Sequence, residues 1–111
     1  MRNAQRSTEM DRIHHVAITV DNIDSAIDWY GERFQFEVSW KDESWALLEF
    51  ENIALALVLP SQHPPHIAFV AQDLERFGEP KSHRDGTASV YLKDNQNNVI
   101  EMLSLPNAAG T

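Results

Sequence analysis

The chain has 111 residues, a length at which we expect one compact domain rather than two. Its formal charge is −8, from 17 acidic and 9 basic side chains, which argues against a nucleic-acid partner because a polyanion would be repelled. It contains no cysteine, so disulfide bonds and thiolate chemistry are excluded. No apolar run is long enough to cross a bilayer and no targeting motif opens the chain, so we expect a cytoplasmic protein without membrane contact. The polar ends, residues 1–11 and 107–111, predict disordered tails around one domain of residues 12–106.

The first half of the domain predicts one strand, one helix and three further strands. Residues 13–20 are rich in β-branched side chains, which favours a strand. Asp24 is the expected N-cap of a helix over residues 25–34, because apolar residues recur there at helical spacing. The three strands that follow are predicted at residues 36–41, 45–50 and 53–59.

The second half repeats this order of elements. Residues 15–24 and 66–75 match in type at most positions, and each stretch is typical of a strand that leads into a helix start. Only residues 71–80 separate the first two strands of the second half, so its helix should shorten to one or two turns. Further strands are predicted at residues 79–84, 87–93 and 99–104. The sequence therefore predicts an α+β fold of two tandem βαβββ modules, residues 12–60 and 64–106.

Strand alternation places two histidines on the same kind of face. His15 shares its face with small and polar residues, whereas the bulky apolar residues of that strand point the other way. His66 has the equivalent position in the second module. Since a face covered by a helix needs bulky apolar residues, the face of the two histidines is the one expected to hold a ligand. Glu101 lies within the apolar run Val-Ile-Glu-Met-Leu, where a carboxylate is costly to bury unless it meets a cation.

Residues 13–30 read Ile-His-His-Val-Ala-Ile-Thr-Val-Asp-Asn-Ile-Asp-Ser-Ala-Ile-Asp-Trp-Tyr. This run resembles the vicinal-oxygen-chelate superfamily, which includes glyoxalase I, bleomycin-resistance proteins, fosfomycin-resistance enzymes and extradiol dioxygenases. The resemblance extends over residues 13–105 and implies a cupped mixed β-sheet with helices outside. It also implies metal ligands at His15, His66 and Glu101, around one divalent ion (Zn, Mn, Ni or Fe). Two imidazoles and one carboxylate leave coordination sites open for the oxygens of a substrate.

The chain departs from many relatives at the fourth ligand, which is usually a Glu on the fourth strand. The turn at residues 51–52 assigns this position to Ala56, whereas the spacing of the repeat would assign it to Glu49. We prefer Ala56, because Glu49 precedes its hairpin turn and Glu101 follows its own. Without the second carboxylate, the proton transfer of glyoxalase I is not expected.

Three polar residues near the third ligand are the predicted catalytic groups. Tyr91 precedes Glu101 as a Tyr does in fosfomycin-resistance enzymes and extradiol dioxygenases, and is the expected hydrogen-bond donor or proton carrier. Ser89 and Lys81 match the oxyanion contacts of fosfomycin-resistance enzymes and are the expected orienting groups. The position of the catalytic Thr of those enzymes is Ala17 here, which argues against fosfomycin modification.

The other three histidines are predicted to play lesser parts. His14 precedes His15 and should point to the opposite face of the strand, as a structural residue. His63 lies beside two prolines in a loop and is expected to be solvated. His83 is a candidate general base for a dioxygenase, with a polar edge residue as the simpler interpretation.

Three classes of function fit these patterns. The first is a metal-dependent enzyme of lyase, isomerase or transferase type that binds a small substrate through adjacent oxygens. The second is an Fe(II) extradiol-type dioxygenase. The third is a metal-free drug-binding protein like the bleomycin-resistance proteins, with an apolar cup lined by Trp40, Trp45 and Phe50 unless these pack in the core. Open sheet edges predict a homodimer, and the ligands could then come from one subunit or two.

Overall fold

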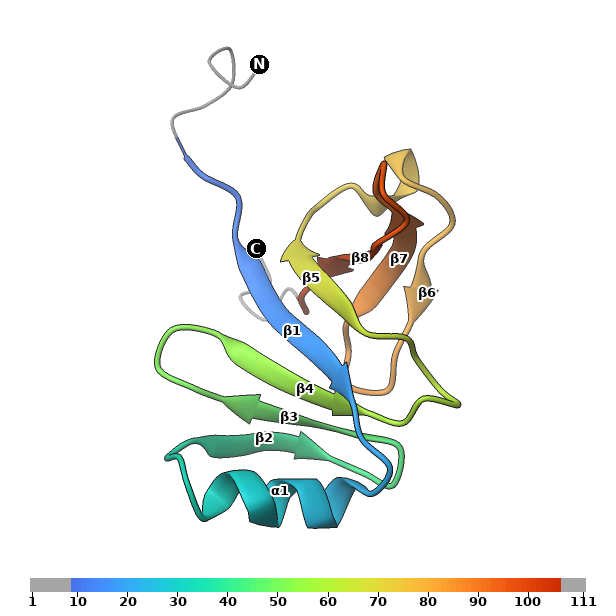
Figure 1. Ribbon diagram of the computed structural model, residues 1–111. Helices are drawn as coiled ribbons and strands as arrows, with labels where there is room; N and C mark the ends of the chain where they lie inside the picture. Colours follow the sequence, from blue (N-terminus) through green and yellow to red (C-terminus); the bar gives the residue numbers. More distant parts are fainter. Residues whose placement is uncertain (1–8, 107–111) are drawn as a thin grey trace.

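The computed structural model describes residues 9–106, which form a curled eight-stranded sheet with a single α-helix (Figure 1). The elements of the first module are β1 (Ile13–Thr19), α1 (Ile23–Gly31), β2 (Glu37–Lys41), β3 (Trp45–Glu49) and β4 (Ala54–Val58). Those of the second are β5 (His66–Val70), the 3-10 turn η2 (Leu74–Arg76), β6 (Lys81–Ser82), β7 (Ala88–Lys93) and β8 (Val99–Ser104). The predicted fold is confirmed, with η2 in place of a second helix. Most of the predicted tails, residues 1–8 and 107–111, lies outside the described residues.

The two modules join through their first strands. The strand order is β2-β3-β4-β1-β5-β8-β7-β6, in which β1 and β5 are antiparallel neighbours. Within each module the first strand runs parallel to the last, β1 beside β4 and β5 beside β8. At the joint His15 pairs with Ala68 while Ala17 pairs with His66, so corresponding residues exchange partners across an approximate two-fold axis. The cup is therefore formed by both modules of one chain.

The helix α1 begins two residues earlier than the sequence indicated. Asn22, not Asp24, is the N-cap: its side-chain oxygen accepts a hydrogen bond from the Ser25 amide at 2.8 Å. Asp24 lies in the first turn instead, where its carboxylate pairs with Lys41 Nζ at 2.7 Å. The helix ends at Gly31 rather than at residue 34, because glycine is a poor helix former.

The two faces of the sheet are packed differently. On the outer face, α1 covers Leu48 and Leu57, which are both fully buried. The inner face carries small or aliphatic residues, among them Ala17 and Ala56, with Trp40 and Trp45 packed against them. Phe50 packs on the helix side, so only the two tryptophans of the predicted aromatic wall belong to the cup. Within residues 9–106 there is no helix with the length and apolar character that crossing a membrane requires.

Asp42 links the turn between β2 and β3 to the second module. Its Oδ1 accepts hydrogen bonds from the Ser44 amide (2.8 Å), the Ser44 hydroxyl (2.9 Å) and the Trp45 amide (3.1 Å). Its Oδ2 accepts from Trp40 Nε1 at 3.1 Å and from Arg84 at 2.6 Å. Burial alone would raise the pKa of Asp42, but the hydrogen bonds from Ser44, Trp40 and Trp45 hold it below its usual value.

Replacing Asp42 with Asn should lower the free energy of unfolding by about 2 kcal/mol at pH 6, because hydrogen bonds to a charged group are lost. A lowered folded-state pKa means that the stabilisation is complete above the unfolded pKa of about 4 and is lost as the pH falls further. Urea unfolding of wild type and Asp42→Asn at pH 6 and pH 3 measures this. An equal difference between the two proteins at both pH values would contradict the role of the carboxylate charge.

Candidate functional site

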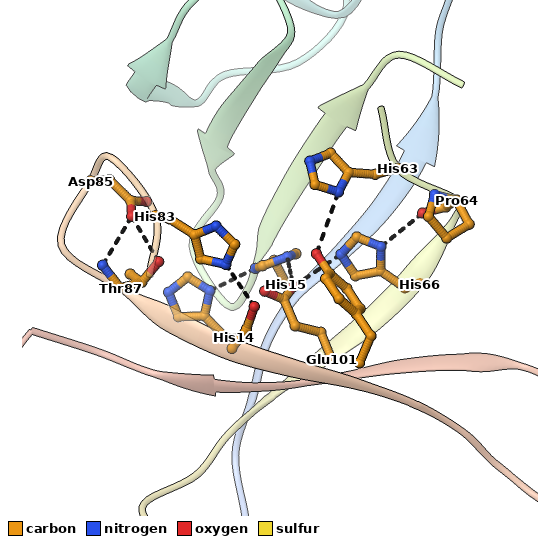
Figure 2. Close-up of polar contacts among 11 residues, drawn as sticks. His14, His15, His63, Pro64, His66, His83, Asp85, Thr87 and Glu101 are labelled. Carbon is orange, nitrogen blue, oxygen red and sulfur yellow. Dashed lines mark hydrogen bonds and ion pairs between the residues drawn. The ribbon is translucent and has the colours of Figure 1, made fainter. Parts of the chain in front are cut away.

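Three buried side chains from three strands meet at one point of the cup. His15 on β1, His66 on β5 and Glu101 on β8 are 7%, 6% and 4% exposed. Glu101 Oε1 lies 3.0 Å from His66 Nε2 and 3.3 Å from His15 Nε2. One ligand atom of each residue lies within 4.8 Å of the others, and Figure 2 shows the three side chains pointing toward one another. All three belong to one chain, because β5 lies between β1 and β8 in the same sheet.

The electrostatics of this group favour an ionised carboxylate. Burial would raise the pKa of Glu101, but hydrogen bonds and charge from His15 and His66 hold it well below its usual range. A buried carboxylate with two imidazole nitrogens is a donor set that suits zinc and other divalent transition metals. The arrangement fits a metal ion, with room for further ligands on the side of the cup.

His66 is held by a contact behind its ring. Its Nδ1 donates a hydrogen bond to the Pro64 carbonyl at 2.8 Å, because a carbonyl oxygen only accepts. In the metal-bound form, in which Nε2 carries no proton, the ring proton of His66 is then on Nδ1 and the Nε2 lone pair is free for the ion. Hydrogen bonds of this kind commonly orient histidine ligands of metal sites.

The prediction that His14 faces away from His15 is wrong. The pairing of β1 with β5 shifts between Ile13 and His15. Ile13 pairs with Phe69 and His15 pairs with Ala68, so two residues along β1 correspond to one residue along β5. His14 is the extra residue of this β-bulge, and a bulge re-aims a side chain that strict alternation would send to the other face. Its Nδ1 lies 2.8 Å from Nδ1 of His15, and burial together with His15 lowers the pKa of His14.

His63 also lies at the site rather than in solvent. Its ring is partly buried, with its centroid 6.2 Å from that of Tyr91 and 6.4 Å from that of His66. Burial and the neighbouring His66 lower the pKa of His63. The sequence pattern missed this residue because alternation does not extend into the loop before β5.

The cup encloses a cavity of about 70 Å³, room for an ion and a few non-hydrogen atoms of a ligand. All five histidines of the chain line it. The other lining residues are Trp45, Leu47, Ala56, Val58, Asp85, Thr87, Tyr91, Glu101 and Leu103. The cavity thus combines hydrogen-bonding groups on one side with an apolar wall on the other, as small-molecule sites commonly do.

The register of the sheet shows which residue corresponds to Glu101 in the first module. Glu101 pairs with Ala68 on the parallel strand beside it, and Ala56 pairs with Ala17 in the same way. Ala17 and Ala68 are equivalent in the repeat, so Ala56 is the counterpart of Glu101. Ala56 lines the cavity, whereas Glu49 is exposed and accepts a hydrogen bond from Ser39 at 3.0 Å.

The three predicted catalytic residues lie at different places. Tyr91 borders the cavity, and burial together with the Glu101 carboxylate raises the pKa of its hydroxyl, which keeps its proton at neutral pH. Ser89 is buried and does not line the cavity. Its Oγ lies 2.6 Å from Nε2 of His83, which does line it. Lys81 is exposed and lines a neighbouring groove that shares His63, His83 and Tyr91 with the cavity.

Two modules joined at their first strands, with the donor group in the shared cup, define a glyoxalase-type fold. The family model described as Glyoxalase/Bleomycin resistance protein/Dioxygenase superfamily matches residues 12–91, and the chain belongs to this superfamily. No curated protein matches the sequence.

Solved structures show the same fold. A methylmalonyl-CoA epimerase in complex with methylmalonyl-CoA and NH4+ is 18% identical, with a TM-score of 0.74 over 89% of this chain and 97% of that one. Methylmalonyl-CoA epimerase from Mycobacterium tuberculosis is 17% identical, with a TM-score of 0.70 over 96% and 97%. A superfamily member from Vibrio splendidus 12B01 is 12% identical, with a TM-score of 0.64 over 86% and 99%. At these identities the likeness concerns the fold alone.

Proposed function

We propose that this protein is a metal-dependent enzyme of isomerase or lyase type that binds a small substrate through two adjacent oxygens. The observation that supports this most is the convergence of His15, His66 and Glu101 within 4.8 Å, all buried, at the wall of a cavity. These residues would hold one divalent ion, with zinc, manganese, nickel and iron as candidates. A bound ion would supply Lewis acidity, stabilising negative charge on a substrate oxygen.

The residues around the donor group can bind the substrate and move a proton. Tyr91 keeps its proton and donates a hydrogen bond to a substrate oxygen. His63 is the group that would take a proton from a carbon beside the carbonyl and return it, since it borders the cavity and is neutral at pH 7. Ser89 orients the ring of His83 through the contact between its Oγ and His83 Nε2. Trp45 and Leu47 exclude water from the opposite side.

Isomerase chemistry is favoured by the epimerases that share the fold. Because the cavity is small, only the reacting end of a substrate would enter it, and the rest would follow the adjoining groove. Lys81 and Lys93 line this groove and would suit an anionic extension such as the phosphates of a CoA ester. Lys81 thus orients the part of the substrate outside the cavity.

The test begins with metal-stripped protein titrated with Zn²⁺, Co²⁺, Mn²⁺ and Ni²⁺. We expect one ion per chain and a rise in melting temperature with each ion that binds. The loaded protein is then incubated in D2O with methylmalonyl-CoA and with small 2-hydroxy ketones, and exchange of the hydrogen beside the carbonyl is followed by NMR. Absence of metal binding would refute the proposal and favour a metal-free drug-binding protein.

A second candidate function is an Fe(II) extradiol-type dioxygenase. Two histidines and one carboxylate with open positions are also the donor set of non-haem Fe(II) oxygenases. His83 would then be the general base, because it borders the cavity and is oriented by Ser89. Oxygen uptake by the iron-loaded protein with a catechol, without hydrogen exchange on carbonyl substrates, would favour this function. A homodimer and a cytoplasmic location stay predictions.

A further inference from the structure

The two histidines of the donor group are each backed by a neighbour at Nδ1. Behind His66 the Pro64 carbonyl accepts at 2.8 Å, and behind His15 the Nδ1 of His14 lies at the same distance. Both contacts lie on the side of the ring away from Glu101, which faces Nε2 of each histidine. Figure 2 shows the two contacts on either side of the donor group.

We infer that His14 is a positioning residue for the metal ligand His15, taking the part that the Pro64 carbonyl takes for His66. The inference rests on the proposed function, since it concerns the metal-bound form. A metal can bind His15 Nε2 only when this nitrogen carries no proton. The proton of a neutral His15 then resides on Nδ1 and is donated to His14 Nδ1, because two ring nitrogens in hydrogen-bond contact share one proton.

The bulge in β1 is what makes this contact possible. In a regular strand His14 would point to the outer face, away from His15. The shifted pairing between Ile13 and His15 lets two consecutive side chains lie on the cavity side instead. In the second module β5 begins at His66, and the backbone of the preceding loop supplies the acceptor. The two modules therefore reach the same orientation of a ligand ring by different local structures.

The protonation of His14 follows from the same hydrogen bond. Since its Nδ1 accepts, a neutral His14 carries its own proton on Nε2. His14 lines the same cavity as the donor group. Removing the acceptor would free the His15 ring to rotate or to take the other tautomer, which weakens metal binding without removing a ligand.

The test compares zinc affinity among wild type, His14→Leu and His14→Asn, measured by competition with a chromophoric chelator. His14→Leu removes the acceptor and should weaken binding about 10- to 100-fold. The amide oxygen of asparagine lies close to where histidine has Nδ1, so His14→Asn should stay within about threefold of wild type. His63→Leu is the matched control, because it removes another cavity histidine, whose ring centroid lies 6.4 Å from that of His66, and its zinc affinity should match wild type.

A second measurement reads the tautomers directly in wild-type protein loaded with zinc. Long-range ¹H–¹⁵N NMR should show a proton on His15 Nδ1 and on His14 Nε2, with His14 Nδ1 unprotonated. Equal zinc affinity of His14→Leu and wild type, or a proton on His14 Nδ1, would overturn the role of His14 and leave the proposed function standing. If wild type binds none of the divalent ions tested above, the proposed function fails, and the role of His14 with it; if it binds one of them but not zinc, the affinities are compared with that ion. Should His14→Leu not fold, the tautomers and the Asn variant still decide.

Discussion

Replacing Glu101 with Gln is expected to lower the affinity for zinc about a thousandfold. Apparent binding energies of structural zinc sites are about 10–16 kcal/mol over three or four ligands, so the loss of one ligand removes about 4 kcal/mol. Glu101 also supplies the only carboxylate in the donor group with His15 and His66. The amide of Gln carries no charge and binds zinc poorly in comparison. Zinc affinity is measured by chelator competition at pH 7.

Glu49→Gln is the matched control for this variant. Glu49 is the carboxylate that the spacing of the repeat would have made a ligand, and it is exposed and bonded to Ser39. Its replacement should leave zinc affinity unchanged. Urea unfolding of both variants without metal shows whether the fold is kept. Tight zinc binding by Glu101→Gln, or a large loss in Glu49→Gln, would place the metal elsewhere.

The fold could be predicted from the sequence because its signals are local. Period-two patterns and β-branched residues mark the strands, and the matching stretches 15–24 and 66–75 reveal the two modules. The short stretch 71–80 correctly indicated a reduced second helix, which is η2. The helix start was misplaced because Asn22 and Asp24 are both good N-caps, and only the backbone conformation distinguishes them.

The candidate site could be predicted only in part. His15, His66 and Glu101 were found because each lies in a strand, where alternation assigns a face, and the structure brings them together. His14 was misplaced because a bulge breaks alternation without a clear sequence mark. His63 was missed because a loop has no period from which its direction can be read. The strand patterns also leave open whether β1 pairs with β5 of the same chain, and this pairing is what brings all three donor residues together within one chain.

Ala56→Glu is expected to convert the donor group into one with four protein ligands and to raise zinc affinity at least tenfold, about 1.4 kcal/mol. Ala56 is the counterpart of Glu101 in the first module, is 1% exposed and lines the cavity. A glutamate there can extend into the cavity rather than into packed side chains. Added negative charge strengthens the attraction for a divalent cation. Without metal the extra buried carboxylate is repelled by Glu101, so the variant should be less stable than wild type.

Ala54→Glu is the control that separates a new ligand from a new charge. Ala54 lies on the same strand and packs in the same inner cluster, and it is 3% exposed, but it does not line the cavity. Its replacement should lower the free energy of unfolding by about 3–5 kcal/mol, because the carboxylate is buried outside the cavity, and zinc should not restore the loss. Zinc should restore the stability of Ala56→Glu, by about 2.7 kcal/mol at a concentration one hundred times the Kd. If zinc affected both variants alike, the equivalence of Ala56 and Glu101 would not extend to metal binding.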